Sequence, residues 1–179
     1  MAHKLITAAT ALPITLSEVK LACRFDGTAL DSDITAMLTD AVQLCEHECG
    51  QVLMPQTWEL TLDAFPGAIE LTRVPVSAIT SIKYTDTVGA LQTLSSSAYA
   101  LDNADGFGLA RVTPVFGTTW PLTRSEANAV KVRYVAGYAD ADAVPSHFKR
   151  QIKIFVAMMI DTPDVLSDRL AAIAKIYAL

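Results

Sequence analysis

Three side chains with metal-binding chemistry lie within one short segment. Cys45, His47 and Cys49 alternate with Glu46 and Glu48, and thiolate and imidazole groups are common ligands of zinc. The segment has a helical period, which places Cys45 and Cys49 on one face and turns His47 roughly 200° away from Cys45. We therefore expect no metal site here. We interpret the cysteines as small core residues, with both glutamates on the solvated face.

Other arrangements that could support catalysis are incomplete. No serine stands in a G-x-S-x-G turn, and a helix cap explains the pair Ser146 and His147 better than a hydrolase does. His3 falls in a terminal tail. The aspartates at 26–33 and 140–142 do not match a calcium loop, and Gly106-Phe107-Gly108 lacks the third glycine of a dinucleotide site. We expect no catalytic, cofactor-binding or metal-binding residues, and therefore no enzyme.

Three cations stand close together near the start of a predicted helix. Lys149, Arg150 and Lys153 occupy its first two turns, although the helix dipole favours negative charge at that end. They either extend into water or meet acidic groups of a binding partner. We take them as candidate interaction residues.

The amino-acid composition excludes some classes of function and favours others. The 179 residues include 14 Lys and Arg against 19 Asp and Glu, and the formal charge of −5 argues against a general DNA-binding surface. Only 18% of the residues are charged and 51% are hydrophobic, compared with about 25% charged in ordinary soluble domains. This shortage of charge favours an oligomer.

Cysteine usage and hydropathy indicate a cytosolic protein. Three cysteines without a disulfide pattern fit a reducing compartment. The segment from Met1 to Ala11 holds no signal-peptide core. The most apolar stretch, at 152–160, contains Lys153 and is much shorter than the roughly 20 residues of a membrane span. We expect no membrane contact.

Two helices are predicted in the first 50 residues of the chain. Thr15 and Glu18 have the spacing of a capping box, which predicts a short helix from Thr15 to about Phe25. Asp31, Ser32 and Asp33 then provide a cap and first-turn negative charge for a second helix that Gly50 ends. Its apolar stripe includes Met37, Leu38, Ala41 and Cys45, which we expect to be buried.

The long segment that begins at Gln51 has the period of β-strands. Trp58, Leu60 and Leu62 alternate with polar residues, as in a half-buried strand. Further strands are predicted at 69–71, 79–84, 92–94, 99–101, 109–112 and 130–135. The short connections between them favour antiparallel pairing.

Helical patterns return near the C-terminus. One helix is predicted from Pro145 to about residue 161, and another from Asp164 to Leu179. The last helix carries two apolar stripes, and one stripe suffices to pack it on its own subunit. The second stripe is the candidate partner interface: Val165, Ala172, Ile176 and Leu179.

These elements predict an α+β fold: a small α-helical bundle formed by N- and C-terminal helices with an inserted antiparallel β region. Helices within 15–50 and 145–179 pack together, because neither set can bury its apolar face alone. The β insertion spans 51–138, and residues 1–179 make one domain.

Several short sequence words occur in an order that resembles a known family. They are Pro13-Ile14-Thr15-Leu16-Ser17-Glu18-Val19-Lys20, Gln56-Thr57-Trp58-Glu59-Leu60-Thr61-Leu62-Asp63, Pro75-Val76, Thr80-Ser81-Ile82-Lys83-Tyr84, Tyr99 with Leu101-Asp102, Trp120-Pro121, Val132 to Tyr138, and Val144-Pro145. From Leu5 to about Met159 the chain resembles the head-tail connector, or adaptor, proteins of long-tailed phages, prophages and gene transfer agents. The last helix matches least.

The resemblance implies a structural role in the virion. Members of this family form a homo-oligomeric ring, commonly a dodecamer, below the portal protein of the DNA-filled head. The ring would pass DNA without reading its sequence and would give a docking platform to a tail or stopper protein. Assembly would take place in the bacterial host cytoplasm. The rival interpretation is a small-ligand-binding or enzymatic α+β domain of unknown substrate.

Overall fold

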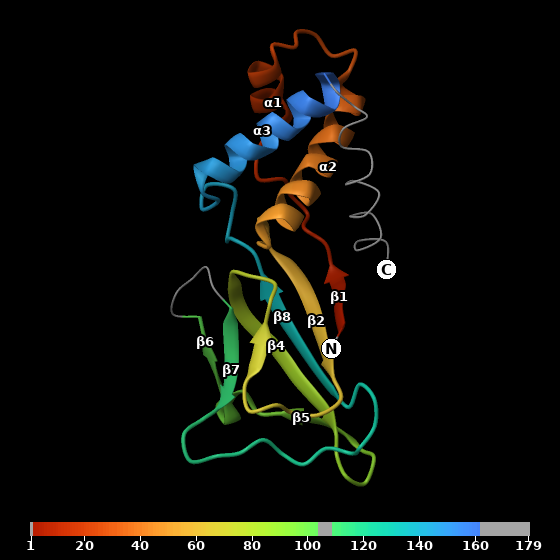
Figure 1. The fold of residues 1–179 in the computed structure, drawn as a ribbon, viewed down its shortest axis with the longest axis vertical. Helices are drawn as coiled ribbons and strands as arrows, with labels where there is room; N and C mark the ends of the chain where they lie inside the picture. Colours follow the sequence, from red (N-terminus) through yellow and green to blue (C-terminus); the bar gives the residue numbers. More distant parts are fainter. Residues whose placement is uncertain (1, 104–108, 162–179) are drawn as a thin grey trace. The chain divides into compact units, whose positions relative to one another are not determined.

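The computed structural model describes residues 2–103 and 109–161 (Figure 1). Within these residues the helices are α1 (Leu16–Cys23), α2 (Asp31–Cys49) and α3 (Ser146–Asp161), with a short 3₁₀ turn at Ser96–Ala98. The strands are β1 (Ala2–Thr7), β2 (Gln56–Leu62), β3 (Ile69–Leu71), β4 (Val76–Thr85), β5 (Leu91–Leu94), β6 (Tyr99–Asp102), β7 (Ala110–Pro114) and β8 (Val130–Ala136). No helix in the described residues combines the length and the apolar character that crossing a bilayer requires.

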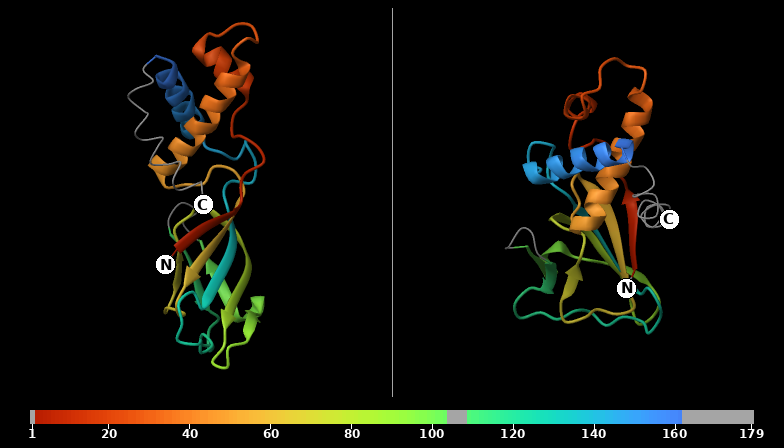
Figure 2. Two further views of the ribbon diagram at one scale, coloured as in Figure 1. Left: turned by 90° about the vertical axis from the view of Figure 1, so that its right-hand side faces the viewer. Right: turned by 45° about the horizontal axis from the view of Figure 1, so that its top comes forward.

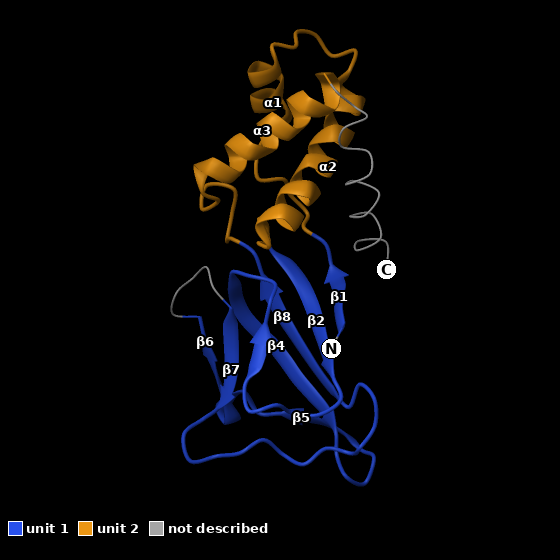
Figure 3. Cartoon of the chain, viewed as in Figure 1, with its two compact units in different colours: residues 1–8, 55–137 blue, residues 9–54, 138–179 orange. Residues whose placement is uncertain are grey.

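The chain divides into two compact units, each built from two separate segments (Figure 3). The sheet unit comprises residues 1–8 and 55–137, and the helical unit comprises residues 9–54 and 138–179. That residues 1–179 form one domain stays a prediction.

The strands of the sheet unit form two antiparallel sheets. The larger has the order β1-β2-β8-β4-β5 and the smaller has the order β3-β7-β6. Strand β8 pairs with β2 on one side and with β4 on the other. Both partners are far from β8 in the sequence. The predicted antiparallel pairing is present in every strand pair of the described residues.

Strand β2 shows why the larger sheet has a buried and an outer face. Its side chains alternate between buried and half-buried along the whole strand, as the sequence pattern predicted. Trp58 is 1% exposed and lies opposite Leu5 of β1 and Tyr134 of β8. Side chains that lie directly opposite in a sheet share a face. The inner face is therefore apolar, and the alternate residues form an outer face.

The helical unit has a core of its own. Figure 2 shows the three helices from two further directions, and each of them contacts the other two. Leu38, Ala41 and Cys45 of α2 are at most 1% exposed, and Met37 packs against this core from a partly buried position. Ile152 and Val156 supply the buried side of α3. The burial predicted for the α2 stripe is thus confirmed for Leu38, Ala41 and Cys45, whereas Met37 is only partly buried.

Local signals explain where the first two helices begin and end. Thr15 accepts a hydrogen bond from the backbone N–H of Glu18, and the Glu18 carboxylate accepts one from the backbone N–H of Thr15, which completes the predicted capping box. Gly50 ends α2 in the left-handed conformation with φ of 67°, where glycine has no steric cost. The cap of α2 differs from the prediction, because Leu30 holds the N-cap position without a side-chain bond.

The predicted fold class is wrong. The described residues form three helices and eight strands in two antiparallel sheets, a sheet-rich α+β fold and not a helical bundle with a β insertion. The error begins at the N-terminus, where Ala2–Thr7 forms strand β1 at the edge of the larger sheet. Its hydrogen-bonding partner β2 follows only after both α1 and α2, so no local pattern reveals the pairing.

Candidate functional site

The three candidate cations lie on the first two turns of α3. Lys149 and Lys153 are half-buried and Arg150 is exposed. The pKa of Glu18 on α1 is lowered, chiefly by its hydrogen bonds with Thr15 and also by the positive charges of Lys153 and Lys149. These two lysines therefore have an acidic neighbour within their own chain. Arg150 forms no ion pair with any of the described residues.

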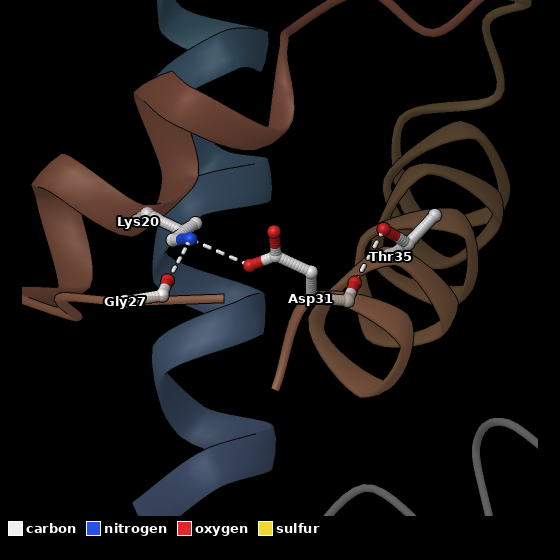
Figure 4. Close-up of polar contacts among 4 residues, drawn as sticks. All are labelled: Lys20, Gly27, Asp31 and Thr35. Atoms are coloured by element: carbon white, nitrogen blue, oxygen red, sulfur yellow. Dashed lines mark hydrogen bonds and ion pairs between the residues drawn. The ribbon is translucent and has the colours of Figure 1, made fainter. Parts of the chain in front are cut away.

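A lysine–aspartate pair holds the loop between α1 and α2. Lys20 Nζ lies 2.5 Å from Asp31 Oδ1, and it also donates a hydrogen bond to the carbonyl of Gly27 (Figure 4). The Thr35 hydroxyl donates to the Asp31 carbonyl at 2.6 Å. Lys20 and Asp31 are only 17% and 34% exposed, so the pair is better shielded from water than an ordinary surface salt bridge. Asp31 thus binds α1 instead of capping α2.

The helical period separates the residues of the Cys45–Cys49 segment as expected. Cys45 is buried, Cys49 is half-buried and His47 is exposed. Within the described part of the chain, no group of three or more His, Cys, Asp or Glu residues could hold a metal ion. A hydrogen bond with Cys49, together with burial, raises the pKa of the Cys45 thiol, and the same bond lowers the pKa of Cys49.

A pocket of about 380 Å³ lies beside these thiols. Its lining residues come from α2 and α3: Cys45, Glu48, Cys49, His147, Phe148, Gln151 and Phe155. The aromatic rings and the methylene groups of the lining make it partly apolar. It is the feature of the helical unit on which a ligand-binding role would rest.

Glu46 does not lie on the solvated face where sequence analysis placed it. Its side chain is 3% exposed, and Glu46 Oε1 accepts a hydrogen bond from the backbone N–H of Leu53 at 2.8 Å. Burial of an acidic side chain is tolerated when its oxygens are hydrogen-bonded. Glu46 thereby holds the segment that follows Gly50 against α2. Glu48 is exposed, as expected.

Sequence analysis missed a polar cluster around His3. His3 lies in β1 and not in a tail: its Nδ1 is 3.3 Å from Tyr134 Oη, and its Nε2 is 3.2 Å from Thr72 Oγ1. Burial and the nearby charge of Arg73 lower the pKa of His3. The Arg73 guanidinium lies over the Trp58 ring, with its carbon 4.6 Å from the ring centroid.

In the structure β1 has the period of an edge strand, with half-buried His3 and Leu5 alternating with exposed Ala2, Lys4 and Ile6. The residue types do not show this period, because polar His3 is on the half-buried side and apolar Ile6 is on the exposed side.

The candidate partner interface at Val165, Ala172, Ile176 and Leu179 lies outside the described residues. It stays a prediction.

Solved structures of gene transfer agent (GTA) particles contain chains with the same fold. A chain of the virion of a native GTA particle matches with a TM-score of 0.75 and 20% identity, over 90% of this chain and 84% of that chain. A chain of the neck of an empty GTA particle, computed with C6 symmetry, matches with a TM-score of 0.76 and 18% identity over the same shares. For the neck of a native GTA particle, computed with C12 symmetry, the TM-score is 0.70 and the identity 21%.

At these identities the likeness is one of fold. The fold of this chain is thus one that occurs in gene transfer agent particles, which agrees with the resemblance that the sequence words indicated. No protein-family model and no curated protein matches the chain.

Proposed function

We propose that this chain is a structural subunit of the neck of a phage-like particle, a head-tail adaptor that assembles into a ring. The observation that carries the proposal is the shared fold with chains from GTA necks, over 90% of this chain. Those necks were computed with C6 and C12 symmetry. A ring of identical subunits is consistent with such symmetry, and a ring of twelve copies would match the C12 symmetry.

The finer parts of the proposal concern the partners. The ring would sit below the portal protein, surround the DNA that leaves the head, and offer a platform to a tail or stopper protein. It would be a virion component assembled in the host cytoplasm. It would contact DNA through the phosphates without sequence specificity, and it would carry out no covalent chemistry.

The α3 cations would lie at one of two locations in the proposed ring. Lys149, Arg150 and Lys153 would face either the DNA channel or acidic groups of the neighbouring subunit. Arg150 is the strongest of the three candidates because it is exposed, whereas the lysines already lie near Glu18. The partner interface would lie at Val165, Ala172, Ile176 and Leu179.

The test of the ring is the mass of the purified protein over a range of concentrations. Native mass spectrometry and light scattering should find assemblies or concentration-dependent self-association, and electron microscopy of the assemblies should show closed rings. A strict monomer that binds a small metabolite in the pocket beside Cys45 and Cys49 would favour the rival class, a ligand-binding or enzymatic domain.

The test of the role in the particle is removal of the gene from the producing bacterium. Electron microscopy should then show DNA-filled heads and separate tails, because the connection between them is missing. Normal tailed particles in the absence of this chain would contradict the adaptor role.

A further inference from the structure

The outer face of the five-stranded sheet carries an excess of positive charge. Lys4 of β1 lies opposite Glu59 of β2, and Glu59 lies opposite Arg133 of β8. Further along the strands, Lys131 of β8 lies directly opposite Lys83 of β4. These residues alternate with the buried ones, so their side chains share the outer face. We call Lys4, Lys83, Lys131 and Arg133 the basic sheet face.

This charge is not neutralised within the described part of the chain. Glu59 accepts a hydrogen bond from Arg133 at 2.8 Å and forms an ion pair with it. Lys4, Lys83 and Lys131 are exposed and form no ion pair with any of the described residues. Two like charges directly opposite in a sheet repel each other and reduce stability. The Lys83–Lys131 pair is therefore a surface that an anionic partner would stabilise.

The complementary charge lies on helix α2. Its 19 residues include five acidic side chains and no lysine or arginine. Asp31 is held in an ion pair, Glu46 is buried and Glu48 lines the pocket beside Cys49. The other two, Asp33 and Asp40, are exposed, and because they are seven positions apart they lie on one side of the helix. We call Asp33 and Asp40 the acidic α2 face.

Asp40 has no compensating cation among the described residues. Although the residue is exposed, partial desolvation raises the pKa of its carboxyl group, and no positive charge from these residues offsets that effect. A carboxylate in such an environment gains more from a cation brought by a partner than a fully solvated one does.

The two units also differ in net charge, in the same sense as the two faces. Of the 14 Lys and Arg residues, seven belong to each unit, whereas the 19 Asp and Glu residues divide into seven in the sheet unit and twelve in the helical unit. The sheet unit is thus neutral overall, and the helical unit carries the entire net charge of −5.

The spacing of the charges also agrees. Lys4 and Lys131 lie on strands two positions apart in the sheet and are offset by two residues along them, since Lys4 is level with Arg133, so their Cα atoms are roughly 12 Å apart. Asp33 and Asp40 are separated by roughly 10.5 Å along the helix axis, since each residue adds about 1.5 Å. A helix that crosses the strands could therefore place one carboxylate near Lys4 and the other near the Lys83–Lys131 pair.

We propose that the basic sheet face of one copy of this chain binds the acidic α2 face of the next copy, as a head-to-tail contact. The inference rests on the proposed ring, because a contact between two different surfaces of identical subunits propagates into a ring or a filament. A second copy is favoured over DNA as the partner because the chain itself carries the matching acidic surface, and its net negative charge repels a polyanion.

The test uses two charge-reversal variants. The sheet variant carries Lys83→Glu and Lys131→Glu, which preserves a like-charged pair in the sheet and therefore leaves its internal repulsion unchanged. The helix variant carries Asp33→Lys and Asp40→Lys. Thermal melting of each variant checks that it is folded, and Arg111→Glu with Glu70→Arg, a reversal of an exposed ion pair elsewhere in the sheet unit, serves as the control.

Each variant alone should self-associate at least about tenfold more weakly than the wild type, because it brings like charges together. An equimolar mixture should assemble with the two variants alternating, since the reversed sheet face of one fits the reversed helix of the other. Sedimentation velocity and native mass spectrometry measure both results. The control should assemble like the wild type.

The contact is refuted if the folded sheet variant assembles like the wild type, or if the mixture fails to associate under conditions in which the wild type does. If the sheet variant assembles normally but loses retention on duplex DNA, the basic sheet face binds phosphates and the proposal is wrong. If neither the wild type nor the mixture associates at any concentration, the proposed ring and this contact both fail.

Discussion

At the scale of single residues, the least expected feature is a buried glutamate that organises the chain after α2. Replacing Glu46 by alanine leaves the Leu53 N–H without its acceptor, and an unsatisfied buried donor costs about 1–3 kcal/mol. We expect Glu46→Ala to lower the free energy of unfolding by that amount in chemical denaturation.

The control for this prediction is Glu46→Gln, which keeps an acceptor oxygen at the same place. It should retain most of the stability of the wild type. Equal losses in the two variants would show that the negative charge of Glu46, and not its hydrogen bond to Leu53, provides the stabilisation.

His3 gives a prediction about pH. Because burial and Arg73 lower its pKa in the folded state from the ordinary value of 6.5, the unfolded chain takes up the proton first as the pH falls. This contribution to stability is present above about pH 6.5 and is lost as the pH decreases from there toward the folded-state pKa.

The measurement is the melting temperature of the wild type and of His3→Gln between about pH 8 and pH 5, a range that spans the ordinary pKa of histidine. The difference between the two proteins should change through this range, in the direction that destabilises the wild type at the lower pH. Parallel curves would mean that the contacts of His3 with Tyr134 and Thr72 do not depend on its protonation.

At the scale of elements, α2 is the helix on which the core of the helical unit depends. Leu38 is 1% exposed on its inner side, and large-to-small changes at such positions cost about 2–5 kcal/mol. Leu38→Ala should therefore lower the free energy of unfolding by that amount. Leu21→Ala on α1 is the matched control, since Leu21 is 83% exposed and its loss should change stability by at most about 0.5 kcal/mol. Similar effects of the two changes would contradict the packing of α2.

At the scale of the whole molecule, the distribution of charge limits how the free protein meets DNA. The net charge of −5 opposes binding to a polyanion, and only a few local cations such as Lys149, Arg150 and Lys153 favour it. We expect weak binding of duplex DNA at low salt and none that survives about 0.2 M salt, because each phosphate contact releases counterions.

Electrophoretic mobility shift assays at several salt concentrations measure this binding. Reversal of the three α3 cations to glutamate should weaken the complex further, whereas Arg111→Ala, which removes a cation that already has an acidic partner, should leave it nearly unchanged. A tight complex that persists above about 0.2 M salt would show that the chain carries a dedicated DNA-binding surface.

Several parts of the structure could be predicted from the sequence because their determinants are local. The capping box of Thr15 and Glu18, the end of α2 at Gly50 and the alternation along β2 all appear as predicted. A helix satisfies its hydrogen bonds between residues close together in the chain, and a half-buried strand shows its period in its own side chains. Such elements are therefore visible in a short window of sequence.

Tertiary structure alone decided the rest, because the partners are far apart in sequence. The insertion of β8 between β2 and β4 and the pairing of β1 with β2 depend on hydrogen bonds between distant segments. The same holds for His3, whose polar neighbours Thr72 and Tyr134 come from other parts of the chain. The like-charged pair Lys83 and Lys131 is likewise invisible in the sequence, since only the register of β4 against β8 brings the two lysines together.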